Sequence, residues 1–345
     1  MTTTIRRKAI SAVSFAITAL CFAASAVRAD PVADFYKGRT ITLVVANAEG
    51  GIYSLFGQMF QRHFPDSMTG HPTVIVNHMT GAGGVRAANY VYNAAARDGS
   101  VLSLLSSGVA TVPVLEPEKV KYDAARLNWL GGWGESVNVL SVFHTAPART
   151  LDEAKRKVDV IGALGKGSPT YQVPHMLNTM LGTRFKIVLG YRGGGPVRLA
   201  MENGEVHGFA GQLLGWQAAK PDWVRDGKIV HLVQLASRAS PELKGVPLLT
   251  DLARNEEERQ IYRLASSGVT AFTLTAPPGV PADRLAAIEK AFTAMLRDPA
   301  FLADAKKRTF PIDPIAAKDI REAVQLLATT PKNVVAKARV AMGLE

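Results

Sequence analysis

Cysteine is almost absent from this 345-residue chain, since its one cysteine, Cys21, lies in an apolar segment near the N-terminus. The rest of the sequence therefore has no disulfide, no thiolate nucleophile and no cysteine metal site. Its stability must come from packing, and a hydrophobic content of 47% is enough for two domains with cores of their own.

Motifs of catalysis and of nucleotide binding are missing as well. The sequence contains no G-x-S-x-G, no H-E-x-x-H and no complete P-loop. Gly81-Ala82-Gly83 begins like a dinucleotide fingerprint, but Arg86 stands where the third glycine belongs. The seven histidines are scattered, and His71 and His78 lack the spacing of metal ligands. We expect no enzymatic activity, no cofactor and no bound metal.

Long apolar runs are confined to the N-terminus. Arg6, Arg7 and Lys8 precede an apolar run over 9–24, and Val27-Arg28-Ala29 resembles a cleavage site. The run is shorter than the ~20 residues of a membrane span, so a retained anchor is the weaker alternative. We predict a signal peptide over 1–29, cleavage before Asp30 and a periplasmic product.

Removal of 1–29 takes away four cations and no acid, so the formal net charge falls from +11 to +7. A positive surface suits an anionic ligand. The sequence has no run of Lys and Arg with interleaved aromatic residues, so a nucleic-acid partner is not expected.

Strands that run into glycine turns are what the sequence does have. The segments 40–51 and 73–84 each join an apolar strand to a glycine turn, and a helix-like stretch follows each turn. Backbone N–H groups in such turns, together with the helix dipole, favour a carboxylate or phosphate. A third strand, 101–105, ends in Ser106-Ser107-Gly108. Alternating strands and helices indicate a parallel sheet, so we expect all three turns at one edge.

A second α/β series begins near Val139. Thr150 and Glu153 form a capping box, Pro196 is expected to open a helix, and Trp216 and Trp223 are expected to share one. Strands are predicted over 158–163, 185–189, 206–210 and 229–236, with polar loops at 165–168 and 191–195. In the first series, Ser54 is predicted to cap a helix with the apolar stripe of Phe56, Met59, Phe60 and Phe64.

The predicted organisation is a signal peptide over 1–29, a discontinuous first lobe of 30–138 and 271–345, and a second lobe of 139–270. A strand after Val269 leads into long helices from near Pro281 to Leu344. We expect these C-terminal helices to pack back on the first lobe.

Several motifs follow one another in a fixed order along the chain. The most specific is VIVNHMTGAGGVRAANYV, over 74–91. The others are the ITLVV strand with Gly50-Gly51, Arg97-Asp98-Gly99, Tyr122-Asp123, the 165–168 loop, Tyr191-Arg192-Gly193, and the segments 202–206, 245–247 and 276–281. In this order they resemble the periplasmic receptors of tripartite tricarboxylate transporters, the Bug-type solute-binding proteins.

The resemblance implies a type II-like Venus-flytrap fold, with two α/β lobes that each contain a mainly parallel sheet flanked by helices. It also implies a small organic carboxylate held between the lobes, no catalysis, and a monomer that delivers its ligand to a membrane permease. The outer domain of a sensor kinase is the alternative partner. A secreted enzyme on the same fold would need a nucleophile or base in the cleft, and none is evident.

The expected ligand-binding residues follow from the same resemblance. They are Glu49, Gly50, Gly51, Ile52, Tyr53, Ser54, Thr80, Gly81, Ala82, Gly83, Gly84 and Ser107 in the first lobe, and Lys166, Gly167, Ser168, Thr170, Tyr191, Arg192, Gly193 and Gln212 in the second. Each has a simpler alternative: glycines that only satisfy turn geometry, Lys166 and Arg192 as solvated cations, and Tyr53 and Tyr191 as packing residues.

Two departures from the family pattern bear on the ligand. Ile52-Tyr53-Ser54 stands where the family usually shows glycine, threonine and aspartate, and Gly211-Gln212 stands where it tends to have Asp-Asn. Both remove carboxylates from the expected crevice, and an ammonium group buried without a counter-charge is costly. We therefore expect a ligand without an amino group, and a place for Tyr53 over a flat ligand.

Overall fold

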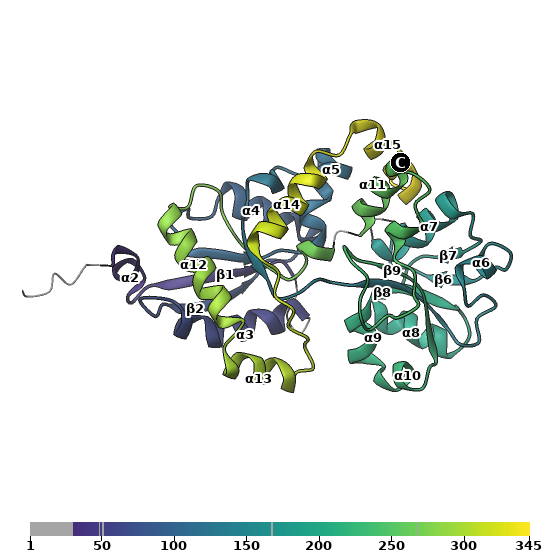
Figure 1. Ribbon diagram of the computed structural model, residues 1–345, viewed down its shortest axis with the longest axis horizontal. Coiled ribbons are helices and arrows are strands. Elements are labelled where there is room, and N and C mark those ends of the chain that lie inside the picture. Colours follow the sequence, from purple (N-terminus) through teal and green to yellow (C-terminus); the bar gives the residue numbers. More distant parts are fainter. Residues whose placement is uncertain (1–29, 48, 50–51, 167, 267) are drawn as a thin grey trace, which may run out of the picture.

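The computed structural model describes residues 30–345, except 48, 50, 51, 167 and 267. Two lobes lie side by side, each built on a five-stranded sheet with helices on its faces (Figure 1). This confirms the predicted two-lobed α/β fold. The predicted signal peptide and Gly50, Gly51 and Gly167 lie outside the described residues.

The sheet of lobe 1 is mixed, with the order β2-β1-β3-β10-β4. Its strands are β1 (Thr40–Val45), β2 (Thr73–His78), β3 (Val101–Leu104), β4 (Asn128–Gly132) and β10 (Thr273–Ala276). β1 pairs in parallel with β2 and β3, with Val45 level with both His78 and Leu104. The loops after these three strands therefore leave one edge, as predicted. β10 runs antiparallel to both of its neighbours.

The helices of lobe 1 come from both ends of its sequence. They are α2 (Pro31–Tyr36), α3 (Ile52–Ser67), η1 (Ala82–Gly84), α4 (Val85–Asn93), η2 (Ser107–Ala110), α5 (Val112–Leu115), η3 (Pro117–Lys119), η4 (Ala124–Arg126), α12 (Ala282–Met295), α13 (Pro299–Lys307) and α14 (Ala317–Ala328). The predicted stripe of α3 is buried, and Phe56 and Phe60 pack against Trp133. Burial of this stripe explains why α3 forms where it does.

The prediction that Ser54 caps this helix is wrong. α3 begins at Ile52, so Ser54 is its third residue and not the residue before its first turn. Its side chain is buried, and its Oγ lies 3.4 Å from Nε2 of His78. The hydroxyl thus joins α3 to the end of β2.

The sheet of lobe 2 has the same plan, with the order β7-β6-β8-β5-β9. Its strands are β5 (Asn138–Phe143), β6 (Val160–Gly162), β7 (Lys186–Val188), β8 (Gly208–Gln212) and β9 (Ile229–Leu235). β5 is antiparallel to β8 and β9, whereas β6 is parallel to β7 and β8. In each sheet, four strands run one way, and the opposed strand is the first that the chain enters after crossing from the other lobe.

The helices of lobe 2 before the chain returns are α6 (Leu151–Ala154), α7 (Pro169–Leu181), α8 (Gly194–Glu202), α9 (Leu213–Ala219), α10 (Pro221–Arg225), η5 (Leu249–Leu252) and α11 (Glu256–Ala265). The next element, η6 (Gly268–Thr270), already packs against η2 and α14 of lobe 1. Thr150 caps α6, accepting from Glu153 N, as predicted. The prediction that Pro196 opens a helix is wrong by two residues, since α8 begins at Gly194 and Pro196 is its third residue, where an N–H would still lack a partner. Trp216 and Trp223 lie on two short helices, α9 and α10, because Pro221 begins a new one.

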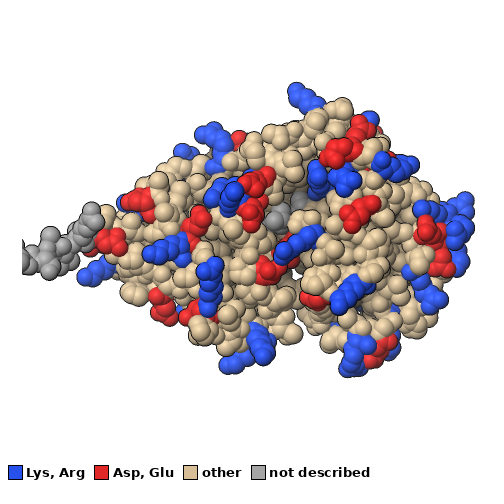
Figure 2. Space-filling model, in the orientation of Figure 1, with Lys and Arg blue, Asp and Glu red and all other residues tan. Residues whose placement is uncertain are grey.

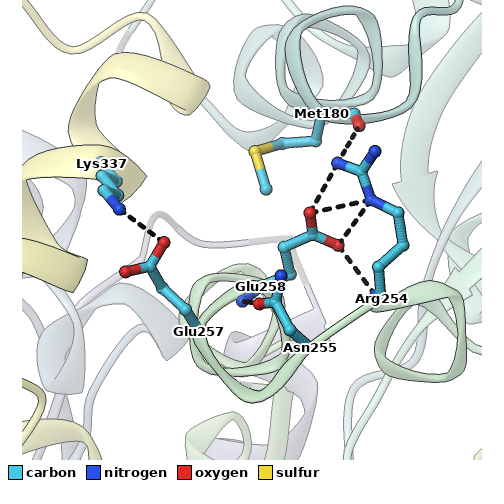
Figure 3. A network of polar contacts seen from close by, with 6 residues as sticks. All are labelled: Met180, Arg254, Asn255, Glu257, Glu258 and Lys337. Carbon is cyan, nitrogen blue, oxygen red and sulfur yellow. Dashed lines mark hydrogen bonds and ion pairs between the residues drawn. The ribbon is translucent and has the colours of Figure 1, made fainter.

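The last helix, α15 (Lys332–Met342), departs from the expectation for the C-terminal helices. α12, α13 and α14 cover lobe 1, but α15 packs against α7 and α11 of lobe 2 and also reaches α5. Its apolar face, which includes Ala338 and Met342, is buried there, and Lys337 pairs with Glu257 of α11 at 2.6 Å (Figure 3). The chain thus ends on lobe 2 and crosses between the lobes three times.

Candidate ligand-binding cleft

The loop after β2 turns on residues with positive φ. Gly81, Gly83 and Gly84 have φ of 133°, 64° and 100°, and Ala82 has φ of 47°. A Cβ on Gly84 would lie 2.6 Å from Oγ of Ser106, so glycine is required there for both conformation and space. Thr80, Gly81, Ala82 and Gly83 are exposed, which leaves this turn open to a ligand.

A polar network that the sequence did not reveal ties the three lobe 1 loops together. Nδ1 of His78 lies 2.7 Å from the Asn47 carbonyl oxygen, and the Ser106 hydroxyl donates to Oδ1 of Asn47 at 3.2 Å. A carbonyl only accepts, so Nδ1 donates to Asn47, and Nε2 lies within hydrogen-bond distance of the Ser54 hydroxyl. The sequence signal that could have predicted this network is a polar residue at or just after the end of each of three neighbouring strands: Asn47, His78 and Ser106.

Tyr53 is a core residue of lobe 1. Its side chain is 6% exposed and its ring centroid lies 5.0 Å from that of Phe272. Burial raises the pKa of Tyr53 to about 12, against the effect of hydrogen bonding with Ser107 and with the Phe272 backbone. The packing is that of the alternative predicted for Tyr53, and its contact with a ligand stays a prediction. Ile52 packs on the same cluster, and Glu49 is exposed.

The facing loop of lobe 2 is held by its own hydroxyl groups. Ser168 caps α7, accepting from Thr170 N at 3.2 Å, and the Thr170 hydroxyl donates to Ser168 Oγ at 2.9 Å. Thr170 Oγ1 also accepts from Leu164 N. These contacts fix the start of α7, whose N–H groups and dipole favour an anion.

The two predicted cations of lobe 2 are exposed. Within the described residues, neither Lys166 nor Arg192 makes a hydrogen bond or ion pair through its side chain. Tyr191 is half-buried beside Gly162, and burial raises its pKa, with a further contribution from Glu205. Gly193 is the residue before the first turn of α8.

Gln212 lies at the hinge. Its Nε2 donates to Ser136 Oγ at 3.0 Å, which joins the end of β8 to the crossing from β4 to β5. It lines an inter-lobe pocket of about 530 Å³ together with Trp133, Glu135 and Phe272. Burial raises the pKa of the Glu135 carboxyl, although Ser237 donates to it.

Ser107 and the start of α7 meet across the lobes. A hollow of about 80 Å³ is lined by Ser107 and Gly108 of lobe 1 and by Asn138, Pro169 and Gln172 of lobe 2. The structure therefore brings Ser107 to the helix end that Ser168 caps, while Gln212 lines the separate hinge pocket. Figure 2 shows an indentation between the lobes, with Lys and Arg spread over both of them.

Within the described residues, there is no cluster of three or more His, Cys, Asp or Glu that could hold a metal ion. That part of the chain also lacks any helix with the length and hydropathy of a membrane span.

Comparison with known proteins decides the family. The family model "Tripartite tricarboxylate transporter family receptor" matches residues 62–337. The chain belongs to this receptor family. The match takes in the Gly81–Gly84 turn and all of the lobe 2 sheet, whereas Glu49 to Ser54 precede it.

Individual proteins similar to this receptor support the family assignment and the fold. Protein BugT of Bordetella pertussis (strain Tohama I) is 27% identical over 256 residues, which are 70% of this chain and 74% of BugT. A TctC solute binding protein from Polaromonas superposes with a TM-score of 0.67 at 17% identity, over 88% of this chain and 99% of that one. Rpa4515 of R. palustris, solved with adipate, superposes with a TM-score of 0.61 at 19% identity, over 88% of this chain and 97% of Rpa4515. These structures confirm the two-lobed fold.

Proposed function

We propose that the receptor captures one small organic carboxylate between its lobes in the periplasm and delivers it to a membrane transporter of the tripartite tricarboxylate type. The observation that carries this proposal is the meeting of Ser107, at the common edge of three lobe 1 loops, with the capped N-terminus of α7. Family membership and the adipate held by Rpa4515 support a carboxylate as the ligand.

The ligand carboxylate would lie on the backbone N–H groups of the Gly81–Gly84 turn and on the Ser107 hydroxyl. Lobe 2 would close over it with Ser168, Lys166 and Arg192. Contacts that form only when the lobes meet give the closed state its higher affinity, so binding drives closure. The transporter would then recognise the closed form.

The test is calorimetric titration and small-angle scattering of the mature protein with adipate, succinate, malate and citrate. We expect one bound ligand per chain and a smaller radius of gyration on binding. A ligand at 100 times its Kd also adds about 2.7 kcal/mol to the free energy of unfolding, which a thermal-shift screen detects. Stoichiometric binding without compaction would contradict the flytrap mechanism.

Lys166 and Arg192 are proposed to face the ligand in the closed state. Replacement of either by Ala should weaken binding roughly ten-fold or more, because a charge-assisted hydrogen bond contributes about 1.5–3 kcal/mol. Arg126→Ala, an exposed cation in η4, is the matched control and should leave affinity unchanged. Unchanged affinity in both test variants would make Lys166 and Arg192 solvated surface residues.

Ligands without an amino group should bind better than their amino acid counterparts. Ile52, Ser54 and Gln212 provide no carboxylate to balance an ammonium group, and Gln212 is engaged with Ser136. Competition between succinate and aspartate, which differ by that group, measures the preference. A preference for aspartate would show that these positions do not set selectivity.

A further inference from the structure

Lobe 2 carries a cavity of about 930 Å³, and all the described residues that line it belong to this lobe. Its walls are the start of α6, the end of α7, the outer side of β9 and the chain on either side of η5. β9 is the last strand in its sheet, and its pairing with β5 shifts register next to His231. Irregularities of this kind redirect side chains at sheet edges and are frequent beside binding sites.

Arg254 offers a fixed donor at this cavity. Its Nε and Nη2 donate to the Glu258 carboxylate at 2.9 and 2.6 Å, and Nη2 also reaches the Met180 carbonyl at 3.5 Å. Figure 3 shows the other terminal nitrogen of the guanidinium without a contact. Glu258 therefore orients Arg254, and Nη1 has no hydrogen bond with the residues that the structure describes, so it can meet an incoming acceptor. An arginine held in this way loses little rotamer entropy on binding.

The charge of the cavity favours an anion. Arg149, Lys155 and Arg254 line it together with one carboxylate, Asp152. Asp152 pairs with Lys155 at 2.8 Å, and Glu258 balances Arg254. The Arg149 guanidinium makes no hydrogen bond or ion pair with the described residues. One positive charge is thus left over.

The inner part of the cavity is largely apolar. Leu181, Val230, Leu232 and Leu252 line it, and the one ring with polar atoms there is that of His231. Nδ1 of His231 lies 2.8 Å from Ser141 Oγ, and burial lowers the pKa of this histidine to about 4. The imidazole is therefore neutral near pH 7 and adds no charge to the apolar wall.

We propose that this cavity is a second ligand site, which binds an amphipathic organic monoanion with its acidic group at Arg149 and Arg254 and its aromatic or aliphatic body against β9. The site is independent of the inter-lobe cleft, and so of the function proposed above. A receptor with both sites binds two chemically different acids, one between its lobes and one on lobe 2.

The probe for this site is 1-anilinonaphthalene-8-sulfonate, a fluorescent amphipathic anion, titrated into the folded protein. Arg149→Gln removes the unbalanced cation from an exposed position, and Val230→Trp fills the cavity from the edge strand. The matched control is Arg156→Gln, which removes an exposed cation just after α6 that does not line the cavity. Circular dichroism verifies the fold of each variant.

We expect one bound probe per chain, about ten-fold weaker binding in Arg149→Gln and in Val230→Trp, and wild-type binding in Arg156→Gln. Saturating adipate should not displace the probe. The proposal is overturned by equal binding in all variants, by an equal loss in Arg156→Gln, or by displacement with adipate. A last control is co-sedimentation of the protein with phosphatidylglycerol vesicles. If the protein sediments with them and Arg149→Gln abolishes this, the rim of the cavity binds a membrane surface and the proposal of a small-molecule site is overturned.

Discussion

His78 has the most connected role of any single side chain near the cleft. Its ring joins the Asn47 carbonyl to the Ser54 hydroxyl, and Asn47 in turn accepts from Ser106. One imidazole therefore fixes the relative positions of the loops after β1, β2 and β3. A ligand bound by backbone N–H groups depends on such positioning, because those groups cannot adjust independently.

His78→Ala should lower affinity for the carboxylate five- to ten-fold while the protein stays folded. The substitution removes two hydrogen bonds, each contributing about 0.5–1.5 kcal/mol. Part of this loss appears as a lower stability of lobe 1 and the rest as weaker ligand binding. Calorimetric titration measures the affinity and thermal unfolding the stability. His144→Ala, at an exposed position on lobe 2, should change neither. A fall in stability with unchanged affinity would confine His78 to a structural role.

At this scale, the sequence predicted the turns better than the side chains around them. The need for glycine at 84 follows in part from backbone conformation, which is a local property, and in part from the close approach of Ser106. The position of Tyr53 does not, since its ring is covered by Phe272, which lies just before β10 and more than 200 positions away in the chain. The burial of Tyr53 could not be predicted for that reason, and its contact with a ligand stays a prediction, as do the roles of Lys166 and Arg192.

Among the elements, α6 and α7 can be compared directly, because each begins after a residue whose side-chain hydroxyl caps it. Thr150 accepts from Glu153 N at 3.1 Å, and Ser168 accepts from Thr170 N at 3.2 Å. α7 begins at the inter-lobe hollow, while α6 begins at the cavity of lobe 2. The same loss of a cap thus has different consequences for ligand binding.

Ser168→Ala and Thr150→Ala should each lower the free energy of unfolding by about 1 kcal/mol, the usual value of an N-cap. Only Ser168→Ala should also weaken binding of the carboxylate ligand, because the Ser168 hydroxyl orients the helix end that faces Ser107. Denaturant titration and calorimetry on both variants test this. Equal effects on affinity would show that the start of α7 does not contact the ligand.

Element types were largely predictable, but their partners were less so. The apolar periods identified the strands and the buried face of α3. The direction of β5 and β10 is decided by where the chain crosses between lobes, which no local pattern records. α15 has an apolar face that would suit either lobe, and its contact with α7 and α11 could not be read from its own residues.

At the scale of the whole molecule, several buried tyrosines have hydroxyl groups with raised pKa values. Burial raises the pKa of Tyr36, Tyr53 and Tyr262 to about 12 in each case. A raised pKa means that the folded state holds the proton more tightly than the unfolded chain does. The resulting stability is complete below pH 10 and is lost as the pH rises from about 10 to 12.

We therefore expect the free energy of unfolding to fall steeply between pH 10 and 12, by up to about 2.7 kcal/mol for each of these groups. Denaturant titrations across this range, with tyrosinate absorbance at 295 nm, measure both effects. Tyr53→Phe should be somewhat less stable at pH 8, because it loses a hydrogen bond, but should lose less stability above pH 10. An equal pH dependence in both proteins would contradict the assignment to Tyr53.

The place of β10 between β3 and β4 in the lobe 1 sheet also governs the order in which the protein can fold. Ser103 of β3 and Thr275 of β10 share a hydrogen bond across 172 positions, and β4 has no other strand partner in that sheet. Lobe 1 therefore cannot complete its core until lobe 2 has been synthesised, and contacts so distant in sequence make folding slow. For a polypeptide that we propose is exported, this delay is useful: it keeps the newly made chain open while it still has to pass through a membrane.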